Sequence, residues 1–318
     1  MIKFILQRLL LTTLPLLLLV SAIAFGLVYI LPGDVTNAIL GADAPRGARE
    51  ALRIELGLDR PIHVQYFSWL GGVLRGDFGA SLVDGVPITT IIAQRLPITL
   101  QLLFYTILIS ILIAIPLGVL AARFRGSPLD HGASFLAMVG LSVPHFWLGI
   151  LAILFVATYW RGFPTSGYVP FTEDPWGSIK MMLLPAVVTS LREAGVLMRF
   201  TRSSLLEVLK ADYIRTAVAK GVTGQNVLFR HALRNSLVPV VTAAGLQAAG
   251  LASGLVITET IFVIPGFGRL ILDAILARDT PVLLATIVVV AALVLLINLL
   301  IDIIYAAIDP RINVEESA

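Results

Sequence analysis

The chain has 318 residues, of which 58% are apolar and only 14% charged, and its mean hydropathy is +0.93. A soluble protein of this length needs more polar surface to cover its core, so the composition excludes that class and indicates several membrane crossings. The net charge of +3 gives no support to nucleic-acid binding, and the absence of cysteine from the sequence excludes disulfides and thiolate metal sites.

The first apolar run, Leu9 to Leu31, is long enough to cross a bilayer as a helix. Lys3 and Arg8 precede it, so we expect this helix to enter the membrane from the cytoplasm. A signal peptide is the alternative, because a basic start and an apolar stretch also fit one. The apolar run continues past Ala24, which favours a retained span.

Residues 32–97 form a long polar segment in which the sequence predicts two short helices. These run from Arg46 to Leu56 and, with an amphipathic pattern, from Ile62 to Leu74. The second helix carries Tyr66, Phe67 and Trp69, residue types that favour the membrane interface. Because seven acidic residues offset six arginines and the charge rule weakens in long loops, we place this segment outside the cell.

Five further apolar runs are long enough to span a bilayer: Ile98 to Ala122, Gly132 to Tyr159, Met181 to Phe200, Leu237 to Thr258 and Val282 to Tyr305. Six spans place both termini on one side. Near the spans, that side carries 12 lysines and arginines, against 4 in the short loops opposite. The prediction is therefore an all-α, polytopic membrane protein with cytoplasmic termini, an external segment at 32–97 and a core at 98–318.

A polar passage from Ala211 to Pro239 interrupts the apolar runs. Asp212 is expected to cap a helix of about ten residues that ends in a left-handed turn at Gly221, and Thr223 to cap a second helix. The surrounding loop, 201–236, lies among seven basic residues: Arg199, Arg202, Lys210, Arg215, Lys220, Arg230 and Arg234. This pattern predicts a rigid cytoplasmic surface for a partner protein.

Charged residues within the predicted spans offer a second candidate site. Arg192 lies seven residues before Arg199, which is roughly 10 Å along a helix, and Glu193 follows it. An unpaired charge there costs about 2.5 to 3.5 kcal/mol, so these side chains either line a transport path or bridge to a neighbouring helix. A self-sufficient carrier would use such charges, with Asn298 and Asp302, for ion coupling, although six spans are few for one.

An intramembrane serine protease is the competing enzyme class, since Ser142 lies three residues before His145. No acidic residue nearby would orient the imidazole, and Pro144 lies between them. The spacing of the four histidines matches no metal-binding motif. None of the four lysines is followed by serine or threonine, as a phosphate-binding loop requires, so ATP must be hydrolysed by another protein if it drives transport.

The residues between Thr201 and Val241, TRSSLLEVLKADYIRTAVAKG and then RHALRNSLVPVV, resemble the cytoplasmic loop of permease subunits of ATP-binding-cassette importers. Ala217, Gly221 and Leu233 match the family's generic loop, and the departures are similar to those of its peptide and nickel branch. The resemblance extends over nearly the whole chain through MIKFILQRLL, LGLDRPIHVQYFSWLGGVLRGDFGASL, GLSVPHFWLGI, ETIFVIPGFGRL and YAAIDPRI.

This resemblance implies a type I importer permease fold and a place in the bacterial inner membrane. It implies that the chain forms half of a pore for dipeptides or oligopeptides and that a second homologous permease forms the other half. Nickel complexes, glutathione or another small solute are the alternative substrates. Two ATPase subunits would bind ATP and Mg, and an extracytoplasmic binding protein would deliver substrate. The coupling residues would be Ala211, Asp212, Tyr213, Arg215, Thr216, Ala217, Lys220 and Gly221, and the path or gate would involve Arg192, Glu193, Ser142 and His145.

Overall fold

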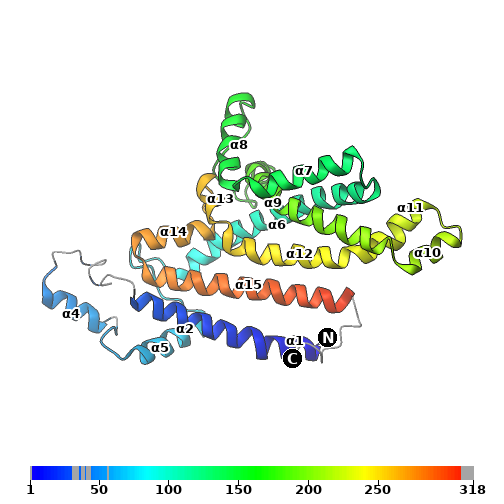
Figure 1. The fold of residues 1–318 in the computed structure, drawn as a ribbon. Helices are drawn as coiled ribbons and strands as arrows, with labels where there is room; N and C mark the ends of the chain where they lie inside the picture. The colour runs from blue at the N-terminus through cyan, green and yellow to red at the C-terminus, as the bar shows by residue number, and fades with distance from the viewer. Residues whose placement is uncertain (1, 31–35, 37–39, 41–43, 56, 309–318) are drawn as a thin grey trace. The chain divides into compact units, whose positions relative to one another are not determined.

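The computed structural model describes residues 2–30, 36, 40, 44–55 and 57–308, and across these ranges the chain is helical, with one isolated β-bridge between Ala80 and Pro87. The helices form two compact units, shown as a ribbon in Figure 1. The amino-terminal unit comprises Ile2–Thr99 and Pro265–Leu296, and the central unit comprises Leu100–Ile264 with residues 297–308. Two helices, α6 (Ile88–Arg123) and α15 (Thr280–Ile308), contribute residues to both units.

The amino-terminal unit begins with one continuous helical stretch and adds short helices. Its elements, besides the start of α6 and of α15, are α1 (Ile2–Arg8), the π-helix η1 (Leu9–Thr13), α2 (Leu14–Ile30), α4 (Arg46–Glu55), α5 (Ile62–Leu74) and α14 (Phe267–Ala277). Of the short helices, α5 packs on the first stretch and α14 on α6 and α15. The predicted bounds of α5 are confirmed.

Aromatic side chains attach α5 to α2. The Ser21 hydroxyl lies 2.9 Å from the Tyr66 hydroxyl, and the Phe25 ring lies 5.5 Å from Tyr66 and 5.8 Å from Trp69 between centroids. Aromatic pairs at these separations add about 0.5 to 1.5 kcal/mol beyond area burial. Two of the three predicted interface aromatics therefore pack against the first span, whereas Phe67 stays 66% exposed.

A buried carboxylate fixes the turn before α6 to the start of α15. Asp279, only 4% exposed, accepts the Ser81 hydroxyl at 2.5 Å and the Leu82 amide at 3.3 Å. The same carboxylate accepts the Val282 amide at 3.4 Å within the first turn of α15. The Ser81 hydroxyl oxygen in turn accepts the amides of Val83 and Asp84. One side chain thus orders both a loop and a helix end.

The central unit packs its long helices through small residues. Its further elements are α7 (Pro128–Ser142), α8 (His145–Tyr159), α9 (Pro175–Val208), α10 (Asp212–Ala219), α11 (Gly224–Asn226), the π-helix η2 (Val227–Ala232), α12 (Leu233–Gly254) and α13 (Val256–Ile261). A Cβ added at Gly140 would lie 2.8 Å from the Leu191 carbonyl oxygen, and one at Gly195 would lie 2.7 Å from that of Ala137. The backbones of α7 and α9 therefore approach as closely as glycine permits.

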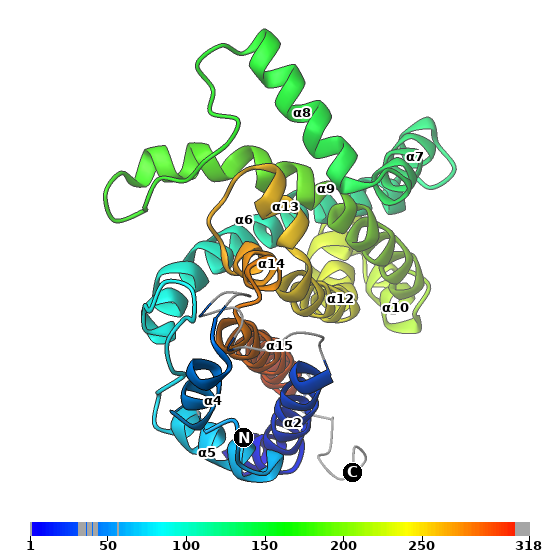
Figure 2. The same ribbon diagram turned by 90° about the vertical axis from the view of Figure 1, so that its left-hand side faces the viewer.

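Within the described ranges, five helical stretches are long and apolar enough to cross a membrane: Ile5–Val28, Ile88–Arg123, Pro175–Val208, Gly224–Gly254 and Thr280–Ile304. They correspond to five of the six predicted spans, although α6 and α9 begin before the predicted residues and α12 ends at Gly254. The sixth predicted run, Gly132 to Tyr159, is present as two helices, because α7 and α8 meet at an angle of 101° (Figure 2).

Proline causes this break. Pro144 disfavours helical backbone at the preceding residue, and Val143 accordingly has φ −84° and ψ 126°. Pro144 also has no amide hydrogen to continue the α7 ladder. Counted as one broken span, the α7 and α8 pair brings the total to six.

We predict that Asp279→Ala lowers stability by about 3 kcal/mol, because the Ser81 hydroxyl and the Leu82 amide lose a charged acceptor in a buried site. The measurement is the thermal unfolding of the full chain purified in mild detergent. Asp273→Ala is the control: this α14 carboxylate is 54% exposed and 3.9 Å from Arg269, so its loss should cost about 0 to 1 kcal/mol. Equal shifts for both variants would contradict the assigned role of Asp279.

Candidate coupling region and transport path

The helix predicted after Ala211 is present as α10. Ala211 occupies the N-cap position with extended backbone and makes no side-chain cap bond, so the prediction that Asp212 caps the helix is wrong. The Asp212 carboxylate instead opens the first turn and lies 3.4 Å from Nη1 of Arg215, with both side chains exposed. The Thr216 hydroxyl donates to the Asp212 carbonyl at 3.0 Å. Thr223 does occupy the N-cap position of α11, without a side-chain bond.

The left-handed turn predicted at Gly221 is confirmed, with φ +81°. The Gly221 amide donates to Val218 and the Val222 amide to Ala217, and these two bonds close the end of the helix. A Cβ at Gly221 would meet nothing within 4 Å. Its backbone angle, and not lack of space, therefore requires glycine at this position.

One face of α10 is fixed to the central unit. Ile214, 3% exposed, packs in a cluster with Val119, Ala122, Leu205, Val227, Leu228 and Ala232, which come from α6, α9 and η2. The Tyr213 hydroxyl accepts a hydrogen bond from Asn235 of α12 at 2.9 Å. Ala217 is partly buried on the next turn. α10 is therefore held by a shared apolar cluster with α6, α9 and η2 and by a hydrogen bond to α12.

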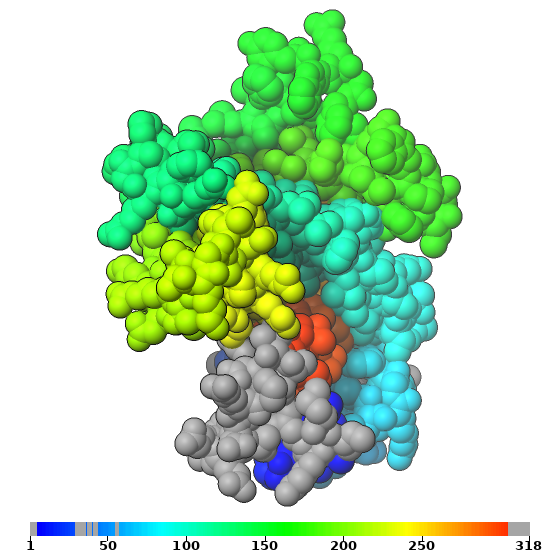
Figure 3. All heavy atoms as spheres, turned by 90° about the vertical axis from the view of Figure 1, so that its right-hand side faces the viewer, coloured from blue at the N-terminus to red at the C-terminus, as the bar shows by residue number. Residues whose placement is uncertain are grey.

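The other face of α10 is exposed. Tyr213 is 45% and Val218 57% exposed, and the side chains of Arg215 and Lys220 lie in solvent beside them. Phe229 of η2 adds a further exposed ring. Figure 3 shows this part of the chain, in yellow-green and yellow, at the surface of its unit. The predicted coupling residues therefore form a surface that combines apolar and basic groups, with an anchored back.

An ion pair that the sequence analysis did not predict joins α7 to α9. Arg202 donates to Asp130 through Nε at 2.6 Å and Nη2 at 2.8 Å, and Asp130 also accepts the Gly126 amide at 2.9 Å. Such bidentate pairs are among the strongest charge-assisted bonds. Asp130 follows a Ser-Pro helix start, but only the fold brings it to an arginine 72 residues away.

Arg192 and Glu193 lie on different sides of α9. Their side chains are 57% and 7% exposed, and Nη1 of Arg192 is 3.5 Å from Oε1 of Glu193. Gln247 of α12 donates to the Glu193 carbonyl at 3.2 Å, and its own Oε1 is buried and has no hydrogen-bond partner within the described residues. Glu193 therefore lies inside the central unit beside an amide oxygen that can still accept a bond.

Ser142 and His145 are separated by the break between α7 and α8. Ser142 is the last residue of α7 and His145 the first of α8. In the part of the chain that the structure describes, neither side chain makes a hydrogen bond. The structure does not assemble the serine and histidine arrangement that a protease would need.

Comparison with known proteins supports the resemblance noted in the coupling region. The family described as "Binding-protein-dependent transport system inner membrane component" matches residues 114–314, and its amino-terminal membrane component matches residues 1–103.

Similar proteins cover nearly the whole chain. A provisionally named peptide transport system permease protein of Brucella suis is 44% identical over 94% of this chain and 95% of its own length. The oligopeptide transport system permease protein AppB of Bacillus subtilis is 39% identical, covering 98% of this chain and 100% of its own. The dipeptide transport system permease protein DppB of Escherichia coli K12 is 40% identical, covering 98% and 99%.

A solved structure shows the same fold. A chain of the inward-facing MetNI methionine ABC transporter superposes with a TM-score of 0.58 at 19% identity, over 69% of this chain and 96% of that one. With the matches to both parts of the family and the close full-length relatives, the chain belongs to the family of binding-protein-dependent transport system inner membrane components.

Proposed function

We propose that this protein is the permease subunit of an ATP-driven importer of peptides and forms half of the translocation pore. The observation that carries the proposal is the similarity, over 98% of the chain, to proteins named as dipeptide and oligopeptide permeases. The second half of the pore would be a homologous permease. Two ATPase subunits would bind ATP and Mg, and a binding protein outside the membrane would deliver the peptide.

The proposed orientation places both termini and the α10 surface in the cytoplasm. Its support is the excess of lysine and arginine on that side, 12 against 4 near the spans. The loop Arg161 to Trp176 would then lie outside. The Gly167 amide of this loop donates to the Phe262 carbonyl just after α13 at 2.9 Å, which gives the loop a fixed base for contact with the binding protein or for closing the outer mouth.

The movement of the ATPases would reach the permease helices through a rigid contact at α10. ATP binding closes the ATPases, and the exposed face of α10 would rest in a cleft on one of them. Ile214 would pass the displacement to α6, α9 and η2, since close-packed interiors transmit strain with little compression. The bidentate pair between Arg202 and Asp130 would carry α7 along with α9.

The transport path is proposed to involve Arg192 and Glu193, with Ser142 and His145 at the broken span as a gate. A charge in a span is stable only beside a partner or water, and Arg192 has most of its side chain exposed. A zwitterionic peptide needs a polar path, which such groups would provide. The break at Pro144 supplies a bend that a gate can use.

The class of transporter is tested by purification from the native source in mild detergent. We expect ATPase subunits and a peptide-loaded binding protein to co-purify, and the ligand held by that binding protein identifies the substrate. A nickel complex or glutathione in its place would keep the class and change the cargo. Uphill transport by the chain alone in lipid vesicles would refute the proposal.

We predict that Gly221→Val uncouples ATP hydrolysis from uptake, because a β-branched residue at φ +81° costs about 1 to 3 kcal/mol and distorts the end of α10. ATPase activity and uptake are measured on the same reconstituted complex. Gly224→Val is the matched control, since it also has open space but no positive φ. Ala217→Trp, which would displace the partly buried face of α10 from the central unit, should uncouple as well. Similar coupling in both glycine variants would argue against this role.

We predict that Arg192→Ala with Glu193→Ala reduces uptake while the complex still assembles, because the polar lining of the path is lost. Peptide uptake is measured at equal amounts of assembled complex, judged by size-exclusion chromatography. The control removes a local ion pair outside the proposed path, Arg269 with Asp273 of α14, whose charged atoms lie 3.9 Å apart. Unchanged uptake in the first variant would exclude both residues from the path.

A further inference from the structure

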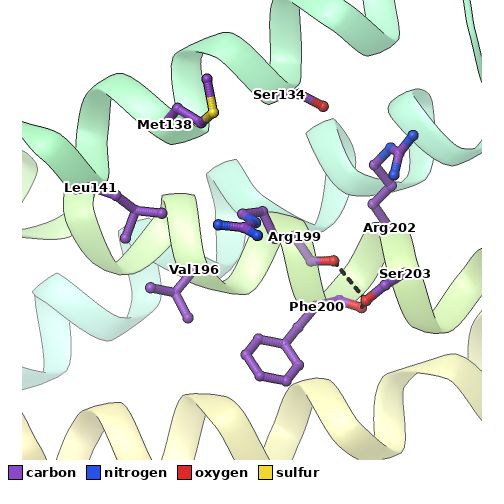
Figure 4. Close-up of a pocket in the computed structure, with 8 residues that line it drawn as sticks. All are labelled: Ser134, Met138, Leu141, Val196, Arg199, Phe200, Arg202 and Ser203. Atoms are coloured by element: carbon purple, nitrogen blue, oxygen red, sulfur yellow. Dashed lines mark hydrogen bonds between the residues drawn. The ribbon is translucent and has the colours of Figure 1, made fainter.

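An open groove of about 650 Å³ lies between α7 and α9 (Figure 4). Its walls are formed by Ser134, Met138 and Leu141 of α7 and by Val196, Arg199, Phe200, Arg202 and Ser203 of α9. The volume falls within the range of about 300 to 1,000 Å³ that is usual for sites binding small molecules.

The groove changes character along its length. Leu141, near the C-terminal end of α7, and Val196 of α9 line one end of the groove. The hydroxyls of Ser134 and Ser203 lie toward the other end, near Arg202. A groove that is apolar at one end and hydroxyl-lined and cationic at the other matches an amphiphile.

Arg199 carries the charge that the structure leaves uncompensated. Both arginines line the groove, but Arg202 is neutralised by its bidentate pair with Asp130. Arg199 projects from α9 into the space between the helices, and within the described residues its guanidinium has no hydrogen-bond or ion-pair partner. Arg199 is exposed along the open groove, and a cation beside a hydroxyl and an apolar wall favours an anionic ligand that also has an apolar part.

The surface around the groove indicates where such a ligand comes from. Phe135, Leu136 and Val139 of α7 are 62%, 62% and 40% exposed and continue the apolar wall outward. Apolar side chains without polar interruption are the surface that acyl chains contact. Basic pockets between spans on the cytoplasmic side also bind anionic lipid headgroups in other membrane proteins.

We propose that this groove binds an anionic phospholipid of the surrounding bilayer, with its phosphate on Arg199 and the hydroxyl of Ser134, and an acyl chain along Leu141 and Val196. The bound lipid would fill the space between α7 and α9 beside the ion pair that joins them. The assignment of this lipid to the inner leaflet rests on the proposed orientation of the protein. The chemical class of the lipid does not depend on that orientation.

The test uses the full chain, purified in mild detergent with the subunits it assembles with, after exchange into nanodiscs of phosphatidylcholine with phosphatidylglycerol. Native mass spectrometry counts the phosphatidylglycerol retained on release. We expect the wild type to retain it and Arg199→Gln to retain about tenfold less, as for the loss of one charge-assisted bond. Arg125→Gln removes an exposed cation from the α6–α7 turn, outside the groove, and should retain as much as the wild type.

Further variants separate the possible occupants. Val196→Trp fills the apolar end, so it should also release phosphatidylglycerol, whereas a site for free phosphate would not respond to it. Arg199→Lys preserves the charge and should retain more phosphatidylglycerol than Arg199→Gln. This comparison separates the loss of charge from poor folding of the variant. A photo-cross-linking residue at Met138 should acquire the mass of a phospholipid. Equal retention by Arg199→Gln and wild type, no retained phosphatidylglycerol, or a cross-link to a protein subunit would each overturn the proposal.

Discussion

The central unit depends on the close approach of α9 to its neighbours. In lipid there is no hydrophobic force between apolar helices, so they hold together by backbone proximity and by a few polar bonds. Glycine allows this on two sides, because a Cβ at Gly118 would meet Thr201 at 2.6 Å and one at Gly195 would meet the Ala137 carbonyl at 2.7 Å. Packed closely against α6 and α7, α9 is a helix of 34 residues that connects the buried Glu193 to the turn before α10.

Two places along α9 have different surroundings. Beyond its C-terminal end, Ile214 seats α10 among residues of three elements, so a force on the exposed face of α10 reaches several helices together. Near the middle of α9, Glu193 and Gln247 place polar groups within an apolar bundle, where each carries a desolvation cost. A transporter that is driven by cytoplasmic ATPases requires a stiff contact, such as the α10 region, and a polar interior, such as the region around Glu193.

Much of this architecture was predictable from the sequence. The hydropathy pattern located five of the spans, and glycine chemistry predicted the positive φ at Gly221. The run over 132–159 is divided at Pro144, and its hydropathy alone does not give the size of that bend. The capping role of Asp212 failed because Ala211 took the N-cap position. The pairs Arg202 with Asp130 and Asp279 with Ser81 join residues far apart in the chain, so composition and spacing contain no signal for either. The exposed and buried sides of Arg192 and Glu193 likewise depend on which helices surround α9.

The junction between α7 and α8 places non-helical backbone within a predicted membrane span. α7 has 15 residues and is therefore about 22 Å long, shorter than the hydrocarbon core of about 30 Å. Extended backbone at Val143 leaves peptide groups near the bend outside any helical ladder. Hydrocarbon offers such groups no donors or acceptors, so non-helical backbone at membrane depth survives only against protein or water. In a bilayer, then, the exposed side of this bend at Ser142 and Pro144 has to be covered by further protein or reached by water.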